Sequence, residues 1–182
     1  MNAKGKELSG LDNWITRNIY KISRAFAIIF GIIWGIDGIL KFQPGLVQAF
    51  PGMVSSAAAG QPSFFSGWYS FWLAQASANP AFWVYTTGIL ELALAFSLIF
   101  GFMRKVSYGG GFLLSLFIWA VPEGFGGPYG PGATDIGTGI IYAMVFLFLI
   151  VLNASNGPNP YTLDSHIEKR FKWWKILAEV KR

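Results

Sequence analysis

Four long apolar stretches, separated by polar or glycine-rich segments, dominate the pattern of hydrophobic positions. They cover residues 20–42, 81–102, 106–121 and 133–153. A helix needs about 20 mostly apolar residues to cross a hydrocarbon core about 30 Å thick. Isolated strands would leave their backbone groups unpaired in lipid. The pattern therefore predicts an all-α integral membrane protein. Its four-helix transmembrane domain covers residues 20–155, between an N-terminal segment, 1–19, and a tail, 156–182.

Charge is scarce and lies on one side of the predicted bundle. Only 13% of the residues are charged, against about 25% in soluble domains. Of the 14 basic residues, all but Lys41 lie before or at the start of the first stretch, between the second and the third, or after the fourth. The positive-inside rule then predicts a multi-pass plasma-membrane protein with both termini cytoplasmic. Positive charge beside apolar spans favours the lipid bilayer as partner and argues against nucleic acid.

The residue inventory excludes several redox groups. The chain has no cysteine and one histidine, His166. Disulfides, iron–sulfur clusters and Cys nucleophiles are therefore excluded, as is bis-His haem ligation within the chain. We expect no metal or haem to be ligated by this chain.

The first predicted outer loop, residues 43–80, carries no charge and is rich in aromatic residues. Phe64, Trp68 and Trp72 recur at a helical spacing of four. This pattern predicts helical structure lying in the membrane interface. The alternative is a cover over a site or a docking face for a partner.

The second outer loop, residues 122–135, is rich in glycine and proline and leads into the fourth span. Such a loop has no regular structure, and its free amides together with a helix N-terminus can hold an anion. The alternative is a simple turn.

The C-terminal tail reads as a basic amphipathic helix on the cytoplasmic membrane surface. Ser165 and Glu168 have the spacing of a capping box. Apolar residues then recur at helical intervals among Lys and Arg, at Ile167, Phe171, Trp174 and Leu177. The sequence predicts a helix from about 165 to 180 with Trp174 buried and His166 solvated.

Several ionisable residues fall inside or beside the predicted spans, where they are costly and usually functional. Asp37 and Lys41 lie one helical turn apart and can neutralise each other. Glu91 lies near the midplane of the second span, with no partner nearby in sequence. Glu123 and Asp135 bracket the glycine-rich loop. Glu123 is compatible with simple solvent exposure and Asp135 with an N-cap.

Three segments resemble a known family. They are residues 35–42 closing the first span, residues 88–104 with Glu91, and the glycine-rich segment from Trp119 to Tyr142. Together they resemble the DoxX/DoxD-like membrane proteins, and most closely the DoxD branch, the membrane subunit of thiosulfate:quinone oxidoreductase. The resemblance covers about residues 20–155. It implies a four-helix bundle that oxidises thiosulfate to tetrathionate and passes the electrons to quinone. It also implies a small DoxA-like partner subunit or a respiratory complex.

On this reading the site lies in the outer half of the bundle. Lys41 binds the anionic sulfur substrate, Asp37 orients Lys41, and Glu91 faces the quinone and donates protons. The remaining candidates are Asp135 as a further catalytic residue, Gly126, Gly127 and Tyr129 for substrate, and Trp83 and Trp119 for quinone. Two alternatives are a non-catalytic scaffold subunit of a terminal quinol oxidase-type complex and a small-solute transporter.

Overall fold

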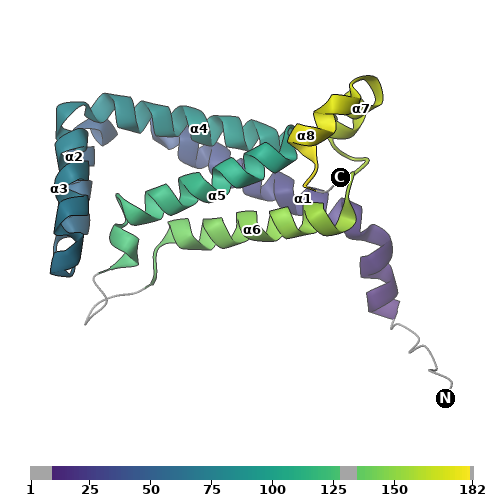
Figure 1. Ribbon diagram of the computed structural model, residues 1–182, viewed down its shortest axis with the longest axis horizontal. Helices are drawn as coiled ribbons and strands as arrows, with labels where there is room; N and C mark the ends of the chain where they lie inside the picture. Colours follow the sequence, from purple (N-terminus) through teal and green to yellow (C-terminus); the bar gives the residue numbers. More distant parts are fainter. Residues whose placement is uncertain (1–9, 128–134, 181–182) are drawn as a thin grey trace, which may run out of the picture.

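A computed structural model describes residues 10–127 and 135–180, and every regular element within these ranges is helical. Figure 1 shows α1, α4, α5 and α6 lying lengthwise along the molecule. The pair α2 and α3 crosses one end, and α7 and α8 cover the other end, where the first helix begins. The elements in chain order are α1 (Gly10–Leu40), α2 (Pro44–Ala58), η1 (Ser63–Phe65), α3 (Ser66–Ala78), α4 (Pro80–Phe100), α5 (Arg104–Ala120), η2 (Gly124–Gly126), α6 (Thr138–Asn156), α7 (Leu163–Arg170), η3 (Lys172–Trp174) and α8 (Lys175–Ala178).

The all-α prediction is confirmed for the described residues. Among them, three helices are long and apolar enough to cross a membrane, namely α1, α4 and α6. The third predicted span corresponds to α5, which has 17 residues and is therefore about 25 Å long. These helices suggest a membrane protein.

The closest packing between α1 and α4 depends on small residues. A Cβ atom at Gly31 would lie 2.9 Å from the Cβ of Leu98, and one at Gly88 would lie 2.8 Å from the Cβ of Lys41. Small residues let helix backbones approach closely, as they do in membrane helix pairs. Gly88 therefore fixes how the C-terminal end of α1 lies against α4.

Aromatic residues fill the middle of the bundle. Phe146 of α6 is fully buried and lies against Gly111 of α5, where a Cβ atom would be 2.2 Å from the ring. The ring of Phe146 also contacts Phe30 and Trp34, at centroid distances of 5.0 Å and 5.5 Å. This cluster joins α1, α5 and α6 into one core.

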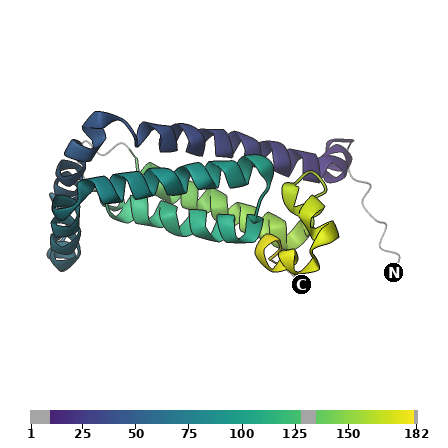
Figure 2. The same cartoon turned by 90° about the horizontal axis from the view of Figure 1, so that it is seen from above.

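The uncharged first loop folds as an antiparallel helix pair that crosses the end of the bundle (Figures 1 and 2). Trp72 packs on Phe117 of α5 and Trp83 of α4, with centroid distances of 5.0 Å and 5.1 Å. Trp68 donates a hydrogen bond to the carbonyl oxygen of Ala120. Phe64, by contrast, is 77% exposed. Of the three residues at helical spacing, Trp68 and Trp72 hold α3 on the bundle, and Phe64 does not.

The tail differs from its prediction in two ways. Its first helix begins at Leu163, and the N-cap is Thr162, whose side chain accepts a hydrogen bond from the Ser165 amide. The helix ends at Arg170 because Phe171 has extended backbone angles. The prediction of one continuous helix from 165 to 180 was therefore wrong.

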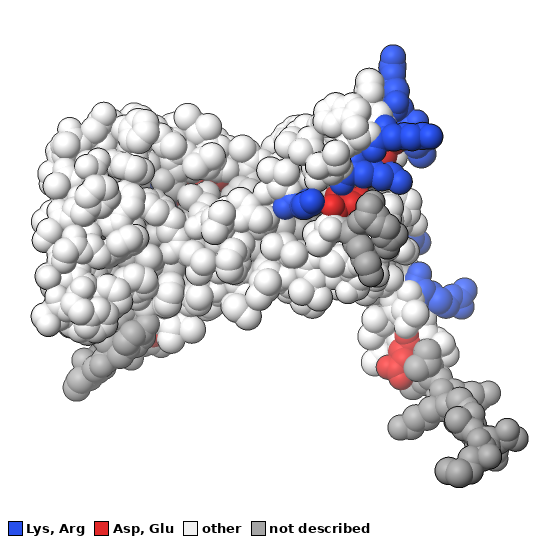
Figure 3. Space-filling model, in the orientation of Figure 1, with Lys and Arg blue, Asp and Glu red and all other residues white. Residues whose placement is uncertain are grey.

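All described cations except Lys41 gather at one end of the molecule. On the face shown in Figure 3, Lys and Arg surround α7, α8 and the beginning of α1, and the opposite end shows none. This is the end at which α1 begins and α8 lies in Figure 1. The arrangement agrees with the segregation of charge expected from the sequence.

Candidate functional site

An ion pair between Lys41, which directly follows α1, and Glu91 of α4 forms the centre of the candidate site. The ammonium nitrogen of Lys41 lies 3.1 Å from Oε2 of Glu91, and the Glu91 side chain is only 2% exposed. The contact is an ion pair that is not aligned as a hydrogen bond. Lys41 reaches across because Gly88, one turn before Glu91, offers no side chain in its path.

Asp37 contacts Lys41 through its backbone, whereas the one-turn spacing predicts a contact between the two side chains. The ammonium group of Lys41 lies 3.4 Å from the backbone oxygen of Asp37, while its side-chain partner is Glu91. The Asp37 carboxylate lies close enough to interact with the Tyr142 hydroxyl. The one-turn pair considered from the sequence is thus replaced by a pair between two helices.

A polar chamber of about 210 Å³ surrounds the ion pair. It lies between α1, α4, α5 and the first turn of α6, which bring together residues distant in sequence. Its lining consists of Trp34, Asp37, Lys41, Glu91, Ser115, Ile118, Glu123, Thr138, Gly139 and Tyr142. The indole N–H of Trp34 is buried and has no acceptor among the described residues. Buried polar groups are nearly always paired, so this donor is available to a ligand in the chamber.

An apolar pocket adjoins the chamber. It also has a volume of about 210 Å³ and shares Lys41, Ile118 and Glu123 with it. The remaining lining comes from α2, α4, α5 and the start of the loop after α5, and consists of Leu46, Phe50, Met53, Val84, Thr87, Phe117 and Pro122. A few polar groups beside an apolar pocket are typical of sites for small organic ligands.

Glu123 turns into the site, although the sequence left it compatible with simple exposure. Its Oε2 accepts a hydrogen bond of 2.8 Å from the amide of Gly139, near the beginning of α6. Burial raises the pKa of the Glu123 carboxyl, and the hydrogen bond from Gly139 opposes this effect. The turn around Gly124 and Phe125, both with positive φ, directs the chain so that this side chain points inward.

The glycine-rich loop offers fewer donors than the sequence suggests. The amides of Gly126 and Gly127 donate to the carbonyl oxygens of Glu123 and Gly124, within the turn itself. The carboxylate of Asp135 is exposed and accepts from the amide of Gly137. Tyr129 lies outside the described residues. None of the described members of this group lines the polar chamber.

The two tryptophans expected at the quinone have structural contacts instead. Trp83 packs against Trp72 and stacks on Phe117. Trp119 donates a hydrogen bond of 2.8 Å to the carbonyl oxygen of Ile136. Neither lines the chamber or the apolar pocket.

Sequence reasoning missed Trp34, Ser115 and Tyr142. Each is an ordinary residue for an apolar helix, and only the helix packing brings it to the chamber. The signal was indirect, because Trp34 precedes Asp37 by three residues and so shares its helix face.

The charges of the chamber are unequal. Lys41 faces three carboxyl groups, those of Asp37, Glu91 and Glu123. If all were ionised, the chamber would carry a net charge of −2. Charges interact strongly where water is scarce, so protonation of the carboxyl groups decides which ligands the chamber accepts. Within residues 10–127 and 135–180, no group of three His, Asp or Glu side chains is arranged to hold a metal ion.

A further cavity lies at the opposite end of the bundle. It measures about 30 Å³ and is lined by polar residues that include Arg24, Arg104 and Asn153. A space of that size holds one or two water molecules. It is therefore too small to be the site for an organic substrate.

The fold and the site together define a helical membrane protein with a charged chamber at one end of its bundle. No protein-family model matches the chain, and comparisons with curated proteins and with solved structures also gave no match.

Proposed function

We propose that this protein is a four-span plasma-membrane oxidoreductase that passes electrons from thiosulfate to membrane quinone. The observation that carries the proposal is the Lys41–Glu91 pair in a polar chamber that joins an apolar pocket. The chamber offers an ammonium group and proton-bearing side chains, and the pocket suits an apolar ring and its chain. The choice of thiosulfate as the substrate rests on the resemblance of three segments to the DoxX/DoxD-like proteins.

The proposed topology has four spans, α1, α4, α5 and α6, and both termini in the cytoplasm. The cationic end of the molecule supports this orientation through the positive-inside rule. A single cysteine at Ser56 tests it, because the chain has no other cysteine. It should react with an impermeant thiol reagent added to intact cells. Reaction only after lysis would reverse the orientation.

The proposed reaction joins two thiosulfates through a new sulfur–sulfur bond. Two thiosulfate ions lose one electron each and form tetrathionate, while quinone takes up two electrons and two protons and becomes quinol. Lys41 attracts the anionic sulfur compound. Tyr142 and the protonated form of Glu91, both on the chamber wall, hold protons that the quinone oxygens take up.

In the proposed binding mode, the quinone occupies both the polar chamber and the apolar pocket. The head group lies in the chamber, where the Trp34 indole N–H donates to one of its oxygens. The apolar chain lies in the pocket beside Leu46, Phe50 and Met53 of α2. A matching ligand oxygen would satisfy the donor of Trp34, which has no other acceptor among the described residues.

Purified protein in lipid nanodiscs, with thiosulfate and a short-chain quinone, tests the activity. The double variant Lys41→Met/Glu91→Gln removes both charges, and so avoids leaving one of them buried without its partner. It should remain folded and lose turnover. Lys21→Met, an exposed change in the N-terminal half of α1, is the matched control. A folded double variant with parental turnover would refute the site.

A second candidate is a non-catalytic subunit of a respiratory complex, including one with a DoxA-like partner. It is favoured by exposed aromatic residues on the first loop, Phe64 at 77% and Phe71 at 55%. The same assay separates the two candidates. Absence of turnover both in the purified chain and in its isolated native complex would favour the scaffold.

A further inference from the structure

The tail separates its charges between two sides. From residue 163 to 180, its acidic residues are all buried, and they are Asp164, Glu168 and Glu179. Its basic residues are all exposed, and they are Lys169, Arg170, Lys172 and Lys175. The sequence alone shows a mixed segment with acids and bases interspersed. The fold turns it into a segment whose outer side carries only positive charge.

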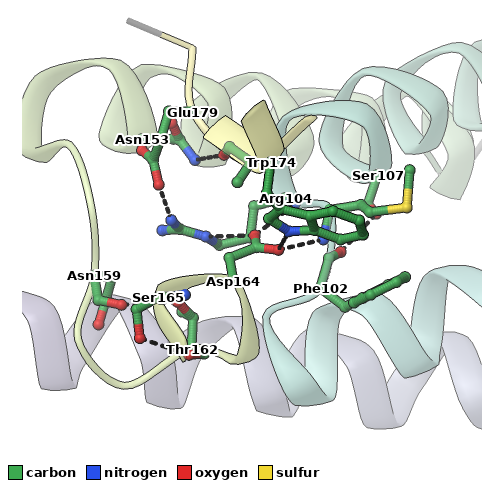
Figure 4. A network of polar contacts seen from close by, with 12 residues as sticks. Phe102, Arg104, Ser107, Asn153, Asn159, Thr162, Asp164, Ser165, Trp174 and Glu179 are labelled. Atoms are coloured by element: carbon green, nitrogen blue, oxygen red, sulfur yellow. Dashed lines mark hydrogen bonds and ion pairs between the residues drawn. The ribbon is translucent and has the colours of Figure 1, made fainter. Parts of the chain in front are cut away.

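Contacts with the bundle hold the acidic side inward (Figure 4). Asp164 accepts hydrogen bonds from the amides of Met103 and Arg104 and from the Arg104 guanidinium. The indole N–H of Trp174 donates to the same carboxylate. Glu179 forms an ion pair with Arg104 as well. These contacts fix the tail against the end of the bundle.

Apolar side chains lie among the outward cations. Phe171 is 46% exposed, Trp173 is 58% exposed and Ile176 is 67% exposed. The Arg170 guanidinium lies 5.6 Å from the centre of the Phe171 ring. Together with the four basic residues, these three form the cationic tail face. Trp174, which the sequence predicts to be buried, is half-buried and packs on Phe102.

The neighbouring surface of the bundle is apolar. Phe96 and Phe100, in the last turns of α4, are about half exposed at 49% and 51%. Helix α4 is one of the helices suited to span a membrane. The cationic tail face therefore adjoins a surface that lipid would cover, at the depth where headgroups begin.

We propose that the cationic tail face binds the surface of a bilayer that carries anionic phospholipid headgroups. The charge complementarity selects the headgroups, and the exposed apolar residues insert between them. This binding needs no redox activity and so stands apart from the proposed enzyme function. Because Asp164 and Glu179 fix the tail on the bundle, binding would also anchor the beginning of α5.

A single label on the tail tests the proposal. Ile176→Cys introduces the only cysteine, since the chain has none, and it carries an environment-sensitive fluorophore. The full chain is placed in nanodiscs of phosphatidylcholine, with or without phosphatidylglycerol. Quenching by aqueous iodide then reports how much of the label is exposed. We expect protection with phosphatidylglycerol, and its loss in high salt.

Charge variants make the test specific. Each cation near an anionic surface contributes about fivefold to binding. Lys172→Gln/Lys175→Gln should thus shift the equilibrium between bound and exposed label by about 25-fold. Arg17→Gln/Lys21→Gln removes the same charge from exposed positions on α1 and should leave the label protected.

Three results would overturn the proposal. The first is equal quenching in both lipid compositions. The second is parental protection in Lys172→Gln/Lys175→Gln. The third is protection that requires an added acidic protein or nucleic acid in place of phosphatidylglycerol.

Discussion

Replacement of Asp164 by asparagine should release the tail from the bundle. Asp164 is fully buried and lies where α5 begins. Its two oxygens accept from the amides of Met103 and Arg104 at 2.8 Å and 3.0 Å, from Nε of Arg104 at 3.1 Å, and from the Trp174 indole at 2.8 Å. Helix α5 has no side-chain cap of its own at Met103. The carboxylate thus caps α5 from a segment about sixty residues later in the chain.

The magnitude follows from these contacts. Asparagine turns one accepting oxygen into an NH2 group that faces donors, and it removes the charge that pairs with Arg104. Removing one partner of a buried ion pair costs about 3–5 kcal/mol. A change of that size corresponds to a shift of roughly 10² to 10³-fold or more in the docking equilibrium of the tail.

Hydrogen exchange followed by mass spectrometry measures the effect on α7. The amide of Phe171, which donates to the carbonyl oxygen of Ile167, should lose its protection in Asp164→Asn. The control is Asp135→Asn, at the other end of the bundle, where asparagine keeps an oxygen for the Gly137 amide. Parental protection of α7 in Asp164→Asn would refute the reasoning.

Three further predictions concern the packing, the tail and the chamber. Gly88→Ala should lower the melting temperature, since its Cβ would lie 2.8 Å from that of Lys41 and overpacking costs about 1–3 kcal/mol. Gly110→Ala, with no atom within 4 Å of its Cβ, is the control, and an equal melting temperature in both would contradict this. Burial, opposed by Arg104, raises the pKa of Glu179 from 4.5 to about 7. Docking of the tail should therefore weaken as pH rises from 4.5 to 7. Hydrogen exchange of α7, corrected for the pH dependence of the intrinsic exchange rate, measures this change. In Glu179→Gln the protection of α7 should no longer depend on pH. Because burial also raises the pKa of Glu123, thiosulfate turnover should increase as pH falls, and a Glu123→Gln variant with the parental pH profile would count against its role.

The helices could be predicted from hydropathy because each is set by local composition. The apolar stretches correspond to α1, α4, α5 and α6 within a few residues at most boundaries, although α1 begins ten residues earlier than its stretch. The grouping of Asp37, Lys41 and Glu91 in one half of the bundle also agrees with the chamber lining. The position of each residue along its helix is enough to predict that the three lie at a similar level of the bundle.

The partners within the site depend on packing between helices and were not predictable. Lys41 pairs with Glu91 because Gly88 allows α1 to lie close to α4. Glu123 points inward because the two residues that follow it have positive φ. Neither the register of two helices nor the direction of a turn is encoded by residue spacing alone.

The tail shows how a local signal can be overridden. Ser165 and Glu168 have the spacing of a capping box, yet Thr162 is the N-cap of α7. Asp164 is drawn to the amides of α5, and Glu168 is buried near Glu179. Ionic contacts with residues distant in sequence set the helix boundaries. A pattern of residues within one helical turn cannot predict such contacts.

The aromatic core separates the two polar ends of the bundle and so constrains the origin of the protons. Phe146 packs on Phe30 and Trp34, between the chamber and the small cavity beside Arg24 and Arg104. Phe146 is fully buried, and Phe30 and Trp34 are 5% and 1% exposed, so they leave little room for a chain of water molecules. Protons consumed at the chamber should then enter from the end crossed by α2 and α3. In liposomes with the chamber facing outward, quinone reduction should make the external medium more alkaline and leave the internal pH unchanged. Internal alkalinisation would show that protons pass the aromatic core.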